Sequence, residues 1–260
     1  MADVDGLLLD IDGVLSVSWR PVAGAIDAMS AFGDAGLPVC LITNTTTHTR
    51  AALADTLNAA GFDVRADRIV TAVTATAEYI RAAHPGASVF VLSDGDARHD
   101  MDGVRLVDDP ESADVIVLGG ASEEFTYDAV NRSFRRLITG DAALVAMHRN
   151  LYWKTADGFE LDAGAYVTGL EAAAGVEAVV CGKPAPAYFR AALDVLGVPA
   201  ERAVMVGDDV VNDVEGARAA GLTGILVRTG KYRDGDLERG TPDVVLDSLA
   251  DVPGWLGLPG

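Results

Sequence analysis

The stretch LLLDIDGVL, residues 7–15, predicts a buried β-strand that ends in two carboxylates, Asp10 and Asp12. Three successive leucines suit a strand covered on both faces, and Gly13 supplies the turn that ends it. Side chains two positions apart lie on one face of a strand, so we expect the two acids to converge at its tip. Carboxylates so close repel each other, which indicates that a proton, a cation or a set of hydrogen-bond donors lies between them.

Further short apolar runs follow along the chain and alternate with helical patterns. This alternation predicts an α/β fold built around a parallel sheet with helices on both faces. Amphipathic helices are expected at residues 21–36, 47–61 and 184–197. The strand-like runs lie at residues 7–9, 39–42, 89–92, 115–118, 178–181, 203–206 and 224–227.

The middle of the chain reads differently from its two ends. Short strand-like runs, an acidic loop at residues 93–109 and the aromatic stretch HRNLYWKTADGF, residues 148–159, fall between residue 81 and about residue 177. We therefore predict a smaller inserted domain at residues 81–177, which divides a core formed by residues 1–80 and 178–260.

The composition is strongly acidic and limits the classes of partner. The chain has 39 Asp and Glu residues against 20 Lys and Arg, a formal net charge of -19, and only three lysines, Lys154, Lys183 and Lys231. Such a field repels polyanions, so neither nucleic acid nor a membrane surface is an expected partner. No apolar run reaches membrane-spanning length, and the first residues carry no secretory pattern. Both cysteines lie in apolar runs, and the expected location is cytoplasmic.

Polar residues recur where the apolar runs of the outer segments end. The carboxyl ends of neighbouring parallel strands meet in one crevice, so side chains far apart in the sequence can share a site there. Several acids with a hydroxyl, an amide and an ammonium suit a hard divalent cation beside a phosphate oxygen. Such a cation would offset the repulsion between the acids. The residues concerned are Asp10, Asp12, Thr43, Asn44, Lys183, Asp208 and Asp209.

Taken in order, these motifs resemble those of the haloacid dehalogenase (HAD) superfamily of phosphatases. The matching elements are DIDGVL, the Thr-Asn strand end, Gly-Lys-Pro at residues 182–184, and Gly-Asp-Asp at residues 207–209 followed by Asp213. The insertion is similar to the α/β cap of the 4-nitrophenylphosphatase-like subfamily. The stretches ITNTTTHTR, GDDVVNDVEGA and LVRTGKYR are most similar to the branch of the phospholysine phosphohistidine inorganic pyrophosphate phosphatases. The resemblance implies a Rossmann-like parallel-sheet HAD core with an inserted smaller α/β cap domain.

The resemblance also implies a role for each motif residue. Asp10 would be the nucleophile that forms an aspartyl-phosphate. Asp12 would act as general acid and then base, with partial burial next to Asp10 favouring its protonated form. Mg²⁺ would be held by Asp10, the main-chain carbonyl of Asp12 and Asp208, with Asp209 or Asp213 in support. The phosphate-binding residues would be Thr43, Asn44 and Lys183.

Four residues of the insertion are candidates for substrate selection, because a cap over the site presents such a loop to the leaving group. Relatives carry Thr-Asn-Pro-Asp where this chain reads His-Arg-Asn-Leu. The alternative, that these side chains only pack the cap, stays open. The candidates are His148, Arg149, Tyr152 and Trp153.

The function that the resemblance implies is Mg²⁺-dependent hydrolysis of small phosphomonoesters, phosphoamides or pyrophosphate. The partner would be a small phosphorylated substrate, and a homo-oligomer through the cap is a further expectation. One alternative is a non-catalytic protein that binds a phospho-ligand on the same fold, although the presence of both Asp10 and Asp12 favours catalysis. A receiver-like signalling domain also pairs acids with Thr and Lys around Mg²⁺, but it is much shorter and lacks a cap.

Overall fold

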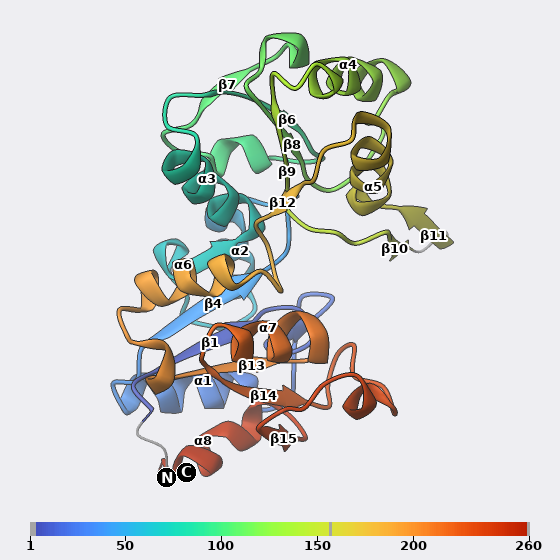
Figure 1. The fold of residues 1–260 in the computed structure, drawn as a ribbon. Helices are drawn as coiled ribbons and strands as arrows, with labels where there is room; N and C mark the ends of the chain where they lie inside the picture. The colour runs from blue at the N-terminus through green and yellow to red at the C-terminus, as the bar shows by residue number, and fades with distance from the viewer. Residues whose placement is uncertain (1–3, 156–157, 259–260) are drawn as a thin grey trace. The chain divides into compact units, whose positions relative to one another are not determined.

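The computed structural model describes residues 4–155 and 158–258 and shows an α/β protein (Figure 1). The chain divides into two compact units, each formed by segments that are distant in the sequence. Unit 1 contains Met1–Thr43, Arg50–Val70 and Lys183–Gly260, and unit 2 contains Asn44–Thr49 and Thr71–Gly182.

Unit 1 is built on a sheet whose strands follow the order β15-β14-β13-β1-β4-β5 within the described residues. β1 lies in the interior of this sheet and pairs in parallel with both neighbours, so that Leu7 lies opposite Val39 on one side and Val204 on the other. The strands are β1 (Gly6–Asp10), β4 (Val39–Thr43), β5 (Ile69–Thr71), β13 (Ala203–Gly207), β14 (Thr223–Val227) and β15 (Val244–Leu246), with a short antiparallel pair β2 (Ser16–Val17) and β3 (Arg20–Pro21) after β1.

The two faces of the unit 1 sheet are covered by different helices, because strand side chains alternate between faces. Leu7 and Leu9 belong to the cluster that contains Phe32 of α1. On β14, Leu226 belongs instead to the cluster formed with Val210. The helices of unit 1 are α1 (Ala25–Asp34), α2 (Arg50–Ala59), α6 (Pro186–Leu196), α7 (Gly216–Ala219), α8 (Val252–Leu256), the π-helix η5 (Val210–Glu215) and the 3-10 turns η1 (Ala66–Arg68), η4 (Ala200–Arg202), η6 (Asp236–Glu238) and η7 (Leu249–Asp251).

Unit 2 has its own parallel sheet, with the strand order β12-β9-β8-β6-β7. Alternation along β6 is complete: Val89 and Val91 pack with helix α3, whereas Phe90 and Leu92 pack with the cluster of α4 and α5. The elements are α3 (Ala72–Ala83), β6 (Ser88–Leu92), η2 (Ala97–Asp100), β7 (Arg105–Val107), η3 (Pro110–Ser112), β8 (Val115–Leu118), α4 (Tyr127–Ile138), β9 (Ala143–Ala146), the hairpin β10 (Tyr152–Thr155) and β11 (Gly158–Leu161), α5 (Ala163–Ala174) and β12 (Val179–Val180).

The α/β class predicted from the sequence is confirmed, while the division at residues 81 and 177 stays a prediction about domains. Two features bear on that division. Helix α3 runs through residue 81. The apolar run at residues 178–181, which the sequence analysis grouped with the core, contains β12 and pairs with β9 in the sheet of unit 2. Across the described residues, no helix combines the length and the apolar character that crossing a bilayer requires.

Candidate active site

The candidate site lies at the carboxyl ends of three neighbouring strands of unit 1. Asp10 is the last residue of β1, Thr43 is the last residue of β4, and Asp208 directly follows β13. β13, β1 and β4 are adjacent in the sheet, and both pairings are parallel. The strand ends therefore meet at one edge, as the parallel-sheet argument predicts.

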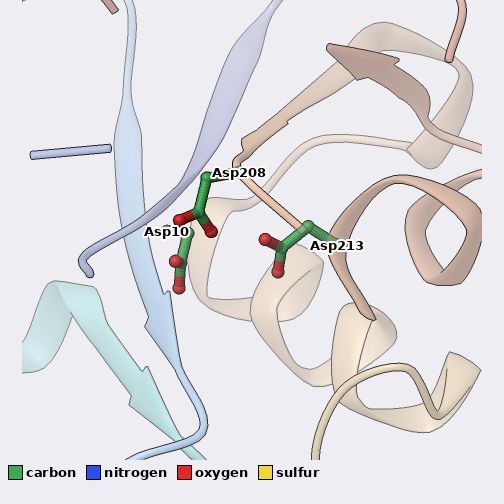
Figure 2. Close-up of side chains that lie close together, drawn as sticks. All are labelled: Asp10, Asp208 and Asp213. Carbon is green, nitrogen blue, oxygen red and sulfur yellow. The ribbon is translucent and has the colours of Figure 1, made fainter. Parts of the chain in front are cut away.

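Three acids form a buried cluster at this edge (Figure 2). One carboxylate oxygen each of Asp10, Asp208 and Asp213 lies within 4.8 Å of the others. Their exposed fractions are 3%, 0% and 1%. Asp213 comes from the π-helix η5, an element that is rare and often marks functional sites. Carboxylates this close and this deeply buried require positive charge or protons beside them.

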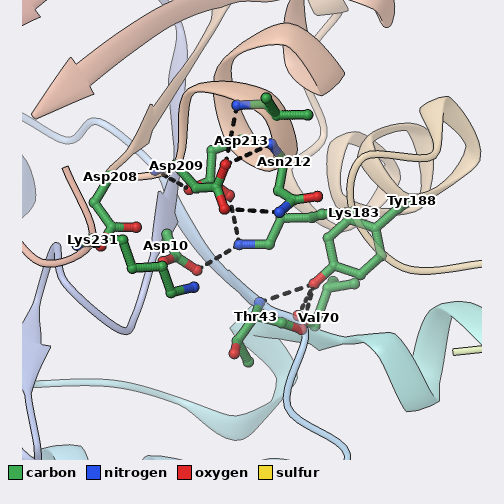
Figure 3. Close-up of polar contacts among 11 residues, drawn as sticks. Asp10, Thr43, Val70, Lys183, Tyr188, Asp208, Asp209, Asn212, Asp213 and Lys231 are labelled. Atoms are coloured by element: carbon green, nitrogen blue, oxygen red, sulfur yellow. Dashed lines mark hydrogen bonds and ion pairs between the residues drawn. The ribbon is translucent and has the colours of Figure 1, made fainter. Parts of the chain in front are cut away.

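Lys183 supplies one positive charge to the cluster (Figure 3). Its Nζ lies 2.6 Å from Asp10 Oδ1 and 2.7 Å from Asp213 Oδ1, and the residue is 6% exposed. Burial alone would lower the pKa of Lys183, but the two carboxylates outweigh burial and raise it well above the ordinary value. Lys183 therefore stays protonated and joins the two acids.

One ammonium does not neutralise three carboxylates, and the remaining charge raises the pKa values of two of the acids. Burial, followed by repulsion from Asp10 and Asp213, raises the pKa of Asp208 to about 7. Burial also raises the pKa of Asp213 to about 6, although Lys183 acts in the opposite direction. The cluster thus carries excess negative charge that a cation would relieve.

The environment of Asp208 fits a hard divalent cation. Its Oδ2 accepts a hydrogen bond of 2.6 Å from the backbone N–H of Lys231. Its Oδ1 is buried and has no hydrogen-bond partner within the part of the chain that the structure describes. Carboxylate oxygens are the ligands that Mg²⁺ prefers, so an unsatisfied oxygen in a cluster of acids fits this ion.

Two glycines hold the carboxylate of Asp208 between loops. Gly13 and Gly230 have φ values of 94° and 60°, and a Cβ atom at either position would lie 1.9 Å from Asp208 Oδ2. Thr229 Oγ1 donates a hydrogen bond to the carbonyl of Gly13, which ties the two loops together. From the sequence, Gly13 is predicted only as a turn residue and Gly230 has no predicted role, because nothing local to either glycine indicates which distant side chain packs against it.

Asp12 is not one of the three acids of the buried cluster. β1 ends at Asp10, so Asp12 falls in the turn that follows, and it is exposed. The alternation that predicted both acids on one strand face does not extend to Asp12, and the partial burial expected for it is wrong.

Asp209 and Asp213, which the sequence left equivalent, make different contacts. Asp209 caps the π-helix: its Oδ1 accepts from the N–H groups of Val211 and Asn212, both at 3.0 Å, and its Oδ2 accepts from Asn212 Nδ2 at 2.8 Å. Burial would raise the pKa of Asp209, but these hydrogen bonds lower it below the ordinary value. Asp213, in contrast, faces Lys183 and the other acids.

Tyr188, which the sequence did not single out, contacts the strand end that carries Thr43. Its buried hydroxyl accepts from the N–H of Thr43 at 2.9 Å and lies 2.8 Å from the carbonyl oxygens of both Thr43 and Val70, to which it donates. Tyr188 therefore fixes the end of β4 that carries Thr43. The available signal was a tyrosine inside an apolar helix face, since a buried phenol needs a polar partner.

The remaining predicted residues belong to unit 2. The side chain of Asn44 packs closely against Gly182: a Cβ atom added to Gly182 would lie 2.7 Å from Asn44 Oδ1. His148 is buried, and its Nδ1 accepts from the N–H of Asn150 at 3.3 Å. Burial lowers the pKa of His148, although Asp162 Oδ1 lies 3.9 Å from Nε2 and acts in the opposite direction. These contacts leave the predicted phosphate role of Asn44 a prediction.

The other cap candidates differ in the contacts and the exposure of their side chains. Arg149 donates to both carboxylate oxygens of Glu171, whose Oε1 also accepts from the N–H of Ala178 at 2.7 Å. Tyr152 is 62% exposed and packs edge-on against Phe159. The backbone of Trp153 lies in β10, and its side chain falls outside the described part of the structure.

The sheet, the site and comparison with known proteins define the class of the protein: it belongs to the haloacid dehalogenase-like hydrolases. Residues 7–106 match the family described by that name, and residues 180–252 match the family described as HAD-hydrolase-like. The predicted superfamily and its Rossmann-like core are thereby confirmed.

Individual relatives narrow the class to phosphatases of the NagD and 4-nitrophenylphosphatase-like subfamily. The chain is 34% identical over 256 residues to phospholysine phosphohistidine inorganic pyrophosphate phosphatase of Rattus norvegicus, covering 96% of this chain and 92% of the relative. It is 37% identical over 236 residues to human haloacid dehalogenase-like hydrolase domain-containing protein 2, covering 91% and 88%.

Solved structures agree with this placement. The p-nitrophenyl phosphatase from Archaeoglobus fulgidus matches with a TM-score of 0.90 and 29% identity, over 97% of this chain and 99% of that one. NagD from E. coli K-12 matches with a TM-score of 0.86 and 28% identity, over 95% and 98%. The protein is a hydrolase of the phosphatase type.

Proposed function

We propose that the protein is a Mg²⁺-dependent phosphatase that cleaves small phosphorylated substrates through an aspartyl-phosphate on Asp10. The observation that carries this proposal is the buried arrangement in which Lys183 joins Asp10 and Asp213 beside Asp208. A carboxylate held in place and kept ionised by an adjacent ammonium is suited to act as a nucleophile.

In the first half-reaction, Asp10 attacks phosphorus in line with the bond to the leaving group. Lys183 is bonded to Oδ1 of Asp10, which leaves the other carboxylate oxygen to form the new bond to phosphorus. As the bond from phosphorus to the leaving oxygen breaks, Asp12 gives its proton to that oxygen. The exposed position of Asp12 suits this role, because the group must reach both the leaving group and water.

In the second half-reaction, water attacks phosphorus and the bond from phosphorus to Asp10 breaks. Asp12, now a carboxylate, takes the proton of that water. Inorganic phosphate leaves, Asp10 is regenerated as a carboxylate and Asp12 as an acid. Thr43 and Asn44 are the proposed donors to the phosphoryl oxygens, and the support for Thr43 is the fixed backbone that Tyr188 gives it.

The ligands proposed for Mg²⁺ are the carboxylates of Asp10 and Asp208 with the main-chain carbonyl of Asp12, and Asp213 supports them. Asp209 acts indirectly, by capping the helix that carries Asp213. When bound, Mg²⁺ supplies positive charge that neutralises the acids and stabilises the charge of the phosphoryl group.

The substrate class is proposed from both the site and the relatives. The proposed contacts are all to the phosphoryl group and none is to the atom that carries it, so small phosphomonoesters are the first candidates. Phosphohistidine, phospholysine and pyrophosphate are the next, because the names of the related enzymes specify them. Among the cap candidates, the exposed ring of Tyr152 supports a role in selection, whereas burial of His148 and the ion pair of Arg149 support packing roles.

Two further expectations remain proposals. A cytoplasmic location is supported by Cys40 and Cys181, which are both free and buried thiols. A homo-oligomer through the cap is supported by exposed apolar side chains on the β10–β11 hairpin, and light scattering of the purified protein tests it. These side chains are Tyr152, Phe159 and Leu161.

Phosphate release measured with 4-nitrophenyl phosphate, phosphohistidine, phospholysine and pyrophosphate tests the proposed function. We expect release in Mg²⁺ and none after the metal is removed with EDTA. Tight binding of inorganic phosphate without turnover of any of these substrates would instead support the non-catalytic alternative. Release that continues unchanged in metal-free buffer would refute the proposed role of Mg²⁺.

A further inference from the structure

A second lysine, which the sequence analysis did not assign to the site, lies at the same edge of unit 1. Lys231 follows β14 in a loop whose backbone is fixed against the acids. Its N–H donates to Asp208 Oδ2 at 2.6 Å, and Gly230 packs against the same oxygen. Thr229 ties the loop to Gly13. These contacts are made by the backbone of Lys231 and by its neighbours in the loop. They fix the position of Lys231, and its ammonium takes no part in them.

The side chain of Lys231 is directed toward the acidic cluster. Figure 3 shows it reaching toward the carboxylate of Asp10, and its ammonium interacts electrostatically with both Asp10 and Asp208. Unlike Lys183, which is buried between two carboxylates, Lys231 is exposed. As an exposed residue, Lys231 is in contact with solvent, whereas very little of Lys183 is.

The charges at this edge of the sheet indicate how the Lys231 ammonium affects the net charge of the site. The three clustered carboxylates carry three negative charges, and Lys183 with one divalent cation carries three positive charges. The carboxylate of Asp209 interacts electrostatically with both Asp213 and Lys231 and adds a fourth negative charge. Without Lys231 the loaded site would therefore be negative, inside a chain whose formal net charge is -19. Such a site would not attract a phosphate dianion electrostatically. Two of the only three lysines in the sequence nevertheless lie here.

We propose that Lys231 is a substrate-binding residue that contacts the phosphoryl group and offsets the negative charge that remains on the metal-loaded site. This inference rests on the proposed phosphatase function and names a residue beyond the four motifs that predicted the site. Its ammonium attracts the anionic substrate and pairs with a phosphoryl oxygen, whereas Lys183 stays bonded to Asp10 and Asp213. Lys231 takes no part in bond making or bond breaking.

The test compares Lys231→Gln with the charge-preserving Lys231→Arg. Both variants keep the backbone N–H that binds Asp208, so the loop should stay in place and the protein should remain folded. For Lys231→Gln we expect the Kd for inorganic phosphate, measured by calorimetry in Mg²⁺, and the KM for 4-nitrophenyl phosphate to rise about tenfold. The decrease of kcat/KM with added salt should also become shallower. Lys231→Arg should retain most of the phosphate affinity.

Arg65→Gln is the matched control, because it removes one positive charge from an exposed residue that pairs with Asp67. Phosphate affinity equal to wild type in Lys231→Gln would overturn the inference. An equal loss in Arg65→Gln would overturn it too, since overall charge would then be the cause. If wild type binds phosphate but hydrolyses none of the substrates, the proposed function fails, and the calorimetric comparison of the variants still decides the role of Lys231.

Discussion

Lys183 and Asp213 form an ion pair of 2.7 Å in the interior of unit 1, and the same ammonium reaches Asp10 at 2.6 Å. A lysine shared by two buried acids lies within ion-pair distance of both, although its single positive charge offsets only one of the two negative charges. Removing it would leave two buried carboxylates without their partner.

We expect Lys183→Met to lower the free energy of unfolding by about 3–5 kcal/mol, the usual cost of leaving a buried charge unpaired. Urea unfolding in EDTA measures this loss. Adding Asp213→Asn in the same chain removes one of the unpaired charges, so the double variant should be more stable than Lys183→Met alone. A single variant as stable as wild type would show that the ion pair does not compensate buried charge.

Asp10→Asn should abolish turnover, because an amide cannot form the aspartyl-phosphate. We expect a decrease in kcat of about 10³-fold or more, with circular dichroism and melting temperature close to those of wild type. The fold should persist since Asn has nearly the same shape as Asp and Lys183 keeps its bond to Asp213. Activity near the wild-type level would rule out Asp10 as the nucleophile.

The raised pKa values of Asp208 and Asp213 predict that stabilisation by Mg²⁺ depends on pH. In the metal-free folded protein these acids have pKa values of about 7 and 6, against an ordinary value of 3.8, so the folded state binds more protons than the unfolded state in this range. Their contribution to stability therefore falls as pH rises through 6 and 7. Mg²⁺ binds the ionised acids, and its effect should be largest above this range.

The measurement is the difference in melting temperature with and without Mg²⁺, taken at a pH about two units above and two units below the middle of that range. The increase on adding Mg²⁺ should be large at the higher pH and small at the lower one. Asp208→Asn should reduce the increase at the higher pH. An equal increase at both pH values would mean that these acids are not the groups that bind the metal.

Substitutions of Asp209 and of Asp213 should have different effects, because the two acids make different contacts. Asp209→Ala removes a helix cap and should cost about 1 kcal/mol of stability, with little change in the Mg²⁺ concentration needed for half-maximal activity. Asp213→Asn removes a charge from the cluster and should raise that concentration about tenfold or more. If Asp209→Ala raised the Mg²⁺ requirement and Asp213→Asn lowered only stability, Asp209 would be the acid that supports the metal and Asp213 would have a structural role.

Tyr188→Phe should weaken the end of β4. The change removes the hydroxyl that bonds the N–H and carbonyl of Thr43 and the carbonyl of Val70, so these backbone groups lose a hydrogen-bond partner in a buried place. We expect a loss of about 1–3 kcal/mol in stability. The KM for 4-nitrophenyl phosphate should rise because Thr43 is less well fixed. An unchanged KM together with lower stability would show that Tyr188 supports the fold alone.

The sequence by itself determined the α/β class and the edge at which polar residues meet. Apolar runs such as LLL at residues 7–9 indicate buried strands. Their alternation with helical patterns favours a parallel sheet. Once strands are parallel, residues that follow them must gather at one end. Asp10, Lys183 and Asp208 can therefore be grouped from the sequence. The run at residues 178–181, predicted for the core, instead contains β12, which pairs with β9 in the sheet of unit 2.

Tertiary structure alone decided how each of these residues is used. That Asp12 is exposed depends on where β1 ends, and the separate contacts of Asp209 and Asp213 depend on a π-helix that periodicity does not reveal. Tyr188 and Lys231 make their hydrogen bonds with residues on other strands and loops. The physical reason is that strand patterning is a local, one-dimensional property, whereas the hydrogen bonds and charges of a buried site depend on which distant segments approach within a few ångströms.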